Sequence, residues 1–249
     1  MPLYRIACVV ALFGLGFGPG FGLGPLSIVS PAAAETRPAV VELFTSQGCS
    51  SCPPADALLG EVARRQDVIA LGFHINYWDS LGWKDPFSTP QSTERQRMYA
   101  RLFGGPIYTP QLVVDGAREV VGSHREAVLA ALRDAAPEAV APVAFAADRH
   151  SVTIGAAGGP AAAGATVGGT GQVWLVRFVQ KRTTHVGAGE NARRTLDDTN
   201  GVEALAALGD WHGADATFPL DPPASGEGIA ILVQAADGRI LGAAALFGS

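Results

Sequence analysis

The sequence is poor in sulfur and in charge. Its 249 residues include three cysteines and two methionines, and only 16% are charged, with a net charge of −5. Because the chain has no basic excess, it has no electrostatic footprint for phosphate, and we expect no nucleic-acid partner. The hydrophobic content of 48% is too high for a disordered acidic tail.

No charged residue occurs between Ile6 and Ala34. An apolar segment follows Arg5, and the small residues 32–34 precede Glu35, which is the pattern of an export signal. Glycines and prolines interrupt the segment, so we predict a cleaved signal peptide over residues 1–34, with an uncleaved anchor as the alternative. The protein is then expected to be periplasmic or secreted, with no membrane span after cleavage.

Removal of the leader leaves two cysteines, in the sequence Cys49-Ser-Ser-Cys52. An oxidising compartment allows this pair to form a disulfide. Closing so short a loop removes little entropy from the unfolded chain, so the pair is better explained by chemistry than by stabilisation. A structural zinc site needs four ligands, and no second C-x-x-C is present, so we predict no metal site.

The pattern of residues 35–138 predicts an α/β domain. A β-α-β opening implies a parallel strand pair, and Asp115-Gly116 predicts a hairpin after it. Ser123 and Glu126 form a capping-box pattern for the last helix. The expected strands are 39–44, 68–75, 111–114 and 119–121, and the expected helices start after Cys52, at Thr89-Pro90 and at Ser123.

Residues 139–249 predict a second, β-rich and sandwich-like domain. Residues 155–171 are rich in Gly and Ala and are expected to form a flexible surface loop. Polar residues at 189–194 and 197–200 are interpreted as solvated turns or a domain contact. The expected strands are 143–145, 152–154, 173–179, 216–220, 229–233 and 240–246.

Two features of the N-terminal domain point to redox chemistry. A C-x-x-C between a strand and a helix places its first cysteine near unpaired helix N–H groups, which stabilise a thiolate. Thr109-Pro110 precedes the third strand, where a cis proline would leave backbone groups free to pair with a substrate peptide. The placement of the C-x-x-C and that of Thr109-Pro110 are independent of each other, and both indicate a redox site.

The sequence is similar to a bacterial secreted thioredoxin-like family, domain of unknown function 1223, in the thioredoxin superfamily. The resemblance rests on the segments 42–56, 74–79, 81–87, 108–116 and 189–191. It implies a thioredoxin-like fold in which Cys49 is the nucleophilic thiol, Cys52 the resolving thiol and Pro110 the cis proline. Glu42 is implied as the buried acid that relays a proton to the resolving cysteine, or else it simply points outward.

The sequence departs from thioredoxin around the cysteines. Gly48 replaces a tryptophan, and Ser50 and Ser51 replace a pair that includes proline. Pro53 and Pro54 cannot donate main-chain hydrogen bonds, so the helix is expected to begin late and to leave Cys49 outside its first turn.

The segment from His74 to Phe87 follows the second strand, where α/β sheets form ligand crevices. His74 and Trp78 are therefore candidate substrate-binding residues. Thr109 is a third candidate, because it precedes the expected cis proline. Packing against the core or the second domain is the alternative that we favour for Trp78 and Trp83.

Taken together, the residues predict an exported thiol-disulfide oxidoreductase that acts on protein or small-molecule thiols and disulfides and needs no bound cofactor. One alternative is a Cu(I)-binding metallochaperone that uses the two thiolates and His74. The other is a redox-silent binding module of the cell envelope.

Overall fold

The computed structural model describes residues 36–135, 140–158 and 169–248. The predicted signal peptide, and residues 159–168 of the predicted flexible loop, lie outside the described residues. None of the described helices is long and apolar enough to cross a membrane.

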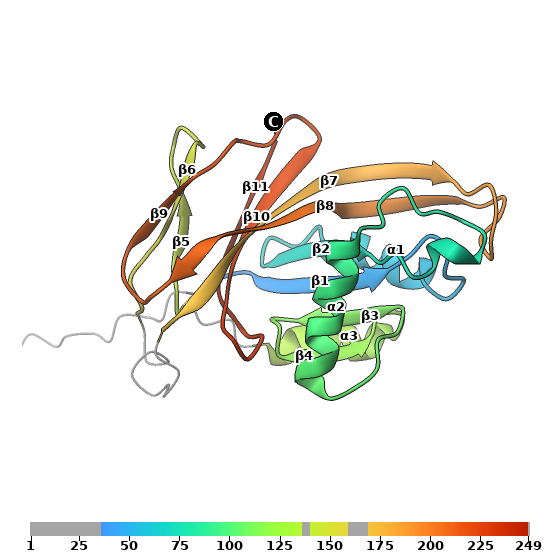
Figure 1. Ribbon diagram of the computed structural model, residues 1–249, viewed down its shortest axis with the longest axis horizontal. Coiled ribbons are helices and arrows are strands. Elements are labelled where there is room, and N and C mark those ends of the chain that lie inside the picture. The colour runs from blue at the N-terminus through green and yellow to red at the C-terminus, as the bar shows by residue number, and fades with distance from the viewer. Residues whose placement is uncertain (1–35, 136–139, 159–168, 249) are drawn as a thin grey trace, which may run out of the picture. The chain divides into compact units, whose positions relative to one another are not determined.

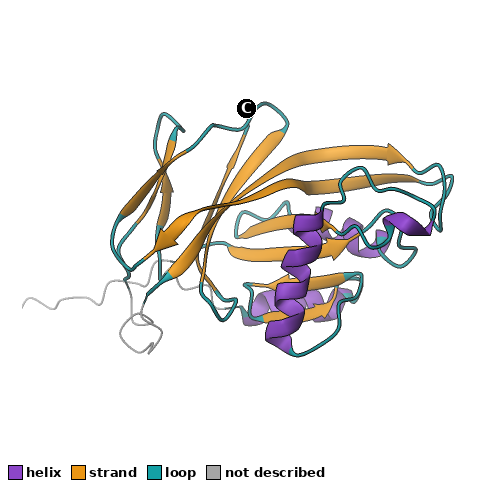
Figure 2. Ribbon diagram, in the orientation of Figure 1, coloured by secondary structure: helices purple, strands orange, loops and turns teal. Residues whose placement is uncertain are grey.

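The elements of the N-terminal half follow the predicted order (Figures 1 and 2). A first strand and helix are followed by a second strand, a long helix, a hairpin and a last helix. Their bounds are β1 (Ala39–Thr45), α1 (Pro53–Val62), β2 (Val68–His74), a 3₁₀ turn (Asp79–Leu81), α2 (Pro90–Phe103), β3 (Gln111–Val114), β4 (Arg118–Val121) and α3 (Arg125–Asp134).

The C-terminal half consists of strands alone among the described residues. These are β5 (Val143–Phe145), β6 (Ser151–Ile154), β7 (Gly171–His185), β8 (Thr195–Trp211), β9 (Ala216–Pro219), β10 (Glu227–Gln234) and β11 (Ile240–Phe247). The expected strand at 173–179 is much longer than predicted, and β8 was not predicted at all. The β7–β8 pair forms the long two-stranded ribbon in Figure 1.

Eight strands form one sheet in the order β11-β10-β7-β8-β2-β1-β3-β4. Within it, β1 and β2 are parallel. β3 pairs antiparallel with β1, and β4 pairs antiparallel with β3. The C-terminal half joins at β2, where Gly72 pairs with Gly201 of β8. The division predicted between residues 138 and 139 stays a prediction, and the sheet is continuous across it.

The two faces of β1 build two different cores. Val41 and Leu43 pack with apolar side chains of α1 and α3, whereas Val40 and Phe44 pack with Tyr99 of α2 and with strands of the C-terminal half. The helices therefore cover opposite faces, with α2 on one side and α1 and α3 on the other (Figure 1). A third cluster lies between the small sheet β5-β6-β9 and the far end of the large one.

Two helix starts test the capping predictions. Thr89 caps α2 as predicted, since its side chain accepts a hydrogen bond from Ser92 N and Pro90 is the first helical residue. The predicted capping box at Ser123 is wrong: α3 begins after His124 and has no side-chain cap. Arg125 N instead donates to the backbone carbonyl of Ser123.

Candidate functional site

Cys49 and Cys52 form a disulfide at the start of α1. Cys52 is the N-cap residue and Pro53 is the first helical residue, so the helix begins immediately after the disulfide. Cys49 lies outside the first turn, as predicted, and its carbonyl accepts a hydrogen bond from Cys52 N. Both cysteines are buried, while Ser50 and Ser51 between them are exposed.

The Thr109–Pro110 peptide bond is cis, as predicted. Trp78 connects this bond to the disulfide loop, residues 46–52. Its indole N–H donates to Thr109 Oγ1 at 2.9 Å, and a Cβ added at Gly48 would lie 3.3 Å from Trp78 Cβ. The structure thus brings Trp78, Thr109 and Pro110 together beside the loop, and the absence of a side chain at Gly48 makes room for the tryptophan.

A buried polar cluster lies on the α1 face of the sheet, at the carboxyl ends of β1 and β2. His74 Nδ1 is 2.7 Å from Asp85 Oδ2, and His74 Nε2 is 3.8 Å from Asp198 Oδ1. Thr45 donates to Asp56 Oδ1 at 2.7 Å. The four ionisable groups come from four separate segments, namely α1, β2, the loop before α2, and β8.

Gln47 joins this cluster to the disulfide loop. Its backbone N–H donates to Asp85 Oδ2 at 2.7 Å, and its side-chain amide donates to Asp198 Oδ2 at 2.6 Å. Trp83 donates to Gln47 Oε1 at 3.1 Å. Trp83 is half-buried and lies close to Gly187 and Gly189 of the C-terminal half. Its hydrogen bond also fixes the orientation of a residue two positions before Cys49.

Burial and charge set the protonation of the cluster. Burial lowers the pKa of His74, but the carboxylates of Asp85, Asp198 and Asp56 outweigh it and raise that pKa to about 9. Asp56 is half-buried, and the partial loss of solvation of its carboxyl raises its pKa to about 7 against the opposing effects of His74 and Thr45. Near neutral pH, His74 is therefore an imidazolium, and Asp56 exchanges a proton.

Glu42 is not brought to the disulfide. It is fully buried on the α2 face, opposite α1, where its carboxylate forms an ion pair with Arg95 and accepts a hydrogen bond from the Tyr99 hydroxyl at 2.6 Å. Gln234 completes this network with a bond to Tyr99 at 2.9 Å. Glu42 therefore does not point outward, but its partners are charged and aromatic groups of α2 rather than Cys52.

The family model for proteins of unknown function DUF1223 matches residues 40–234. The chain belongs to the DUF1223 family. Its similarity extends to the crystal structure of protein AGR_C_4864 from Agrobacterium tumefaciens, with 32% identity and a TM-score of 0.70 over 87% of this chain and 97% of that one. The structure of HBP35 of Porphyromonas gingivalis has a similar fold, with 15% identity and a TM-score of 0.52 over 86% of this chain and 76% of that one. No curated protein matches the sequence significantly.

Several polar residues of this DUF1223 site escaped the sequence analysis. Asp56 follows Cys52 by one helical turn, and that spacing was a signal that could have been used. Asp198 was interpreted as part of a solvated turn or a domain contact, and the structure shows the contact. Asn191 belonged to a segment that marked the family resemblance, yet nothing in its local sequence predicted burial.

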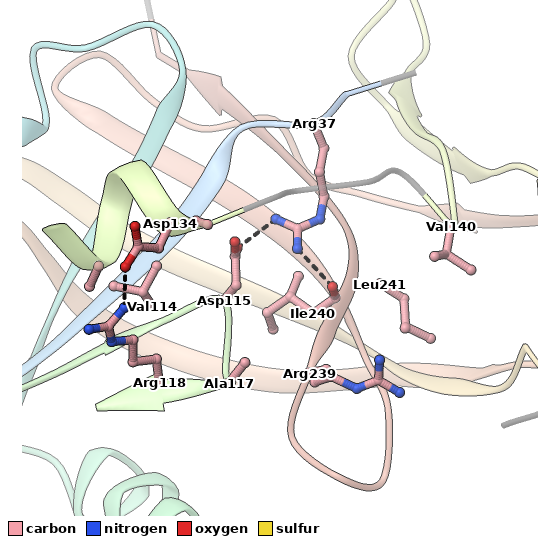
Figure 3. Close-up of a pocket in the computed structure, with 12 residues that line it drawn as sticks. Arg37, Val114, Asp115, Ala117, Arg118, Asp134, Val140, Arg239, Ile240 and Leu241 are labelled. Atoms are coloured by element: carbon pink, nitrogen blue, oxygen red, sulfur yellow. Dashed lines mark hydrogen bonds and ion pairs between the residues drawn. The ribbon is translucent and has the colours of Figure 1, made fainter. Parts of the chain in front are cut away.

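A separate cavity of about 300 Å³ lies at the other end of β1 from the disulfide loop (Figure 3). Four of its charged groups are paired in the wall, Arg37 with Asp115 and Arg118 with Asp134, and Arg239 pairs with Asp237 outside the lining. In the part of the chain that the structure describes, no group of three or more His, Cys, Asp or Glu side chains is arranged to hold a metal ion.

Proposed function

We propose that this DUF1223 protein is an exported thiol-disulfide oxidoreductase of thioredoxin-like fold, with Cys49 and Cys52 as its redox pair. The observation that carries the proposal is the disulfide at the start of α1 with Asp56, an acid that titrates near neutral pH, one helical turn away. The strand order β2-β1-β3-β4 and the cis bond at Pro110 support the thioredoxin-like fold.

The reaction is an exchange of two electrons with a dithiol. A substrate thiolate attacks Sγ of Cys49, forms a mixed disulfide and releases Cys52 as a thiolate. The second substrate thiolate attacks the substrate sulfur of the mixed disulfide, which releases Cys49 as a thiolate and leaves the substrate as a disulfide. Both sulfurs are buried, and Cys49 is the one attacked in this proposal because it lies in the loop outside the helix, whereas Cys52 is held as the N-cap of α1.

Asp56 is the proton donor for the leaving Cys52 thiolate in this proposal. Asp56 N donates to Cys52 O at 3.1 Å, which places the acid in the first turn of the helix that Cys52 caps. Its side chain also lines a cavity of about 480 Å³ between α1 and β8, through which the carboxylate can recover a proton from water. A pKa of about 7 suits an acid that both gives and regains a proton near neutral pH.

The redox midpoint of the pair tests the proposal. Equilibration of the protein with glutathione and dithiothreitol buffers at pH 7 should give a midpoint between about −120 and −270 mV, the band of working exchange catalysts. A midpoint below about −300 mV would refute the proposal, because such a disulfide resists exchange, and it would favour the redox-silent alternative.

The role of Asp56 has its own test. The rate at which dithiothreitol reduces the disulfide should show an inflection near pH 7 in the wild type, and Asp56→Asn should remove the inflection and lower the rate by about tenfold or more. Asp67→Asn, which changes an exposed aspartate after α1, is the matched control and should leave the profile unchanged. An unchanged inflection in Asp56→Asn would exclude the acid from the reaction.

A further inference from the structure

The turn between β7 and β8, residues 186–194, lies against the disulfide loop. Cβ atoms added at Gly187 and Gly189 would lie 3.3 and 3.1 Å from atoms of Trp83, so the turn approaches that indole closely. Beside it, Glu190 accepts a hydrogen bond from Ser50 N at 3.0 Å. We call residues 186–194 the covering turn. It belongs to the C-terminal half of the chain, more than 130 residues after the cysteines.

Asn191 makes the central contact of the covering turn. Its side-chain amide nitrogen donates to Gln47 O at 2.9 Å and to Cys49 O at 2.9 Å. Arg194 donates to Asn191 Oδ1 at 2.8 Å, which fixes the orientation of the amide group. Asn191 is only 1% exposed, so every hydrogen-bonding group of its side chain is used inside the protein.

The two carbonyls that accept hydrogen bonds from Asn191 belong to Gln47 and Cys49, in the N-terminal part of the disulfide loop. Reduction separates the two sulfurs from bonding to van der Waals distance, a change that rotation of the cysteine side chains and a shift of the backbone share. Cys52 caps a helix whereas Cys49 lies outside it, which leaves the Cys49 side of the loop as the part of the backbone that is freer to shift. A pinned Cys49 carbonyl opposes this movement and keeps the Cys49 sulfur beneath the surface.

We propose that Asn191 is a positioning residue that holds the oxidised disulfide loop closed and thereby slows and disfavours reduction of the disulfide. The inference rests on the proposed exchange function of the same cysteines. Asn191 contacts neither sulfur and acts only through the backbone of Cys49 and Gln47. The C-terminal half of the chain, in this view, sets the reactivity of a redox pair that the N-terminal half carries.

The test is Asn191→Asp, which keeps the shape of the side chain but removes both donors. We expect the rate of reduction by dithiothreitol to rise at least tenfold. The equilibrium constant for reduction should also rise about tenfold, which corresponds to a midpoint about 30 mV less negative. The matched control is Gln172→Glu at the opposite end of β7, where the amide also donates to a backbone carbonyl, and this variant should behave as the wild type.

A rate and a midpoint within twofold of the wild-type constants would overturn the proposal. If Asn191→Asp does not fold, Asn191→Ser, which keeps one donor, should give an intermediate effect on both quantities, and wild-type values would again overturn the proposal. Failure of the proposed function looks different. In that case no glutathione buffer reduces the wild-type disulfide. A comparison of the wild type and the variants under a stronger reductant still reports on the role of Asn191.

Discussion

The buried imidazolium at His74 gives the protein a stability that depends on pH in a predictable direction. The pKa of His74 is about 9 in the folded protein against 6.5 for an unperturbed histidine. A raised folded-state pKa stabilises the protein fully below the unfolded value, and the contribution is lost as pH rises through the folded value. The difference between the two values corresponds to about 3 kcal/mol of unfolding free energy, lost between pH 6.5 and 9.

The titration of Asp56 also lowers the free energy of unfolding as pH rises, over a lower range of pH. Its pKa is raised from 3.8 to about 7, so ionisation destabilises the folded state progressively over that interval. Above about pH 8 this penalty is nearly complete, and His74 accounts for most of the remaining change. Urea denaturation of the oxidised protein at half-unit steps from pH 5 to 9 measures both effects, with the steepest loss expected between about pH 6.5 and 7, where the two titration ranges overlap.

Substitution separates His74 from other titrating groups. Because the His74 imidazolium also lowers the pKa of Asp56, the comparison is made in an Asp56→Asn background. There His74→Gln removes the titration and should abolish the loss of stability between pH 7.5 and 9, while His150→Gln, at an exposed position, should keep it. Asp85→Asn should shift the loss to lower pH, since it removes the carboxylate that stabilises the imidazolium most. A flat wild-type profile over this range, or a His74→Gln profile as steep as the wild type, would refute the reasoning.

Two further substitutions test the contacts of the cores and of the covering turn. Arg95→Met leaves the Glu42 carboxylate buried without its ion-pair partner and should lower the free energy of unfolding by about 3–5 kcal/mol in urea denaturation at pH 7; a loss below about 1 kcal/mol would contradict a charged pair there. Gly189→Ala places a Cβ only 3.1 Å from Trp83 at a residue whose φ is 75°. It should destabilise the protein by about 1–2 kcal/mol and speed reduction of the disulfide by dithiothreitol. An unchanged melting curve would count against this close approach.

Local sequence predicted the N-terminal elements well because they are set by short-range signals. The apolar runs of β1 and β2 and the Thr89 cap of α2 are all contained within a few residues. β8 was missed for the opposite reason. Its Asp, Asn and Gly residues disfavour a strand, and its Val202–Leu208 stretch has the apolar spacing of a helix. Pairing with β7 along nearly its whole length overrides these preferences.

The features of the candidate site likewise fall into those that local sequence predicted and those that it did not. The disulfide and the cis bond at Pro110 follow from motifs that a reader can find in the chain. The polar cluster does not, because a carboxylate such as Asp198 is buried only through a hydrogen bond to Gln47, which lies 151 positions away. No local pattern distinguishes it from its exposed neighbour Asp197. The position of Glu42 depended on which face of β1 the helices α1 and α2 cover, and strand periodicity alone does not decide that.

The separation in sequence between the disulfide and its covering turn has a consequence for the order of folding. Cys49 and Cys52 are three residues apart, so their bond can form as soon as the first strand and helix meet. Asn191 and Asp198 reach the loop only after a contact across more than 140 residues has closed, a slow step in a sheet of such distant strands. If the proposed roles of the cysteines and Asn191 hold, we therefore expect the newly made chain to carry an open and reactive disulfide loop first, and its reactivity to fall when the C-terminal strands join the sheet.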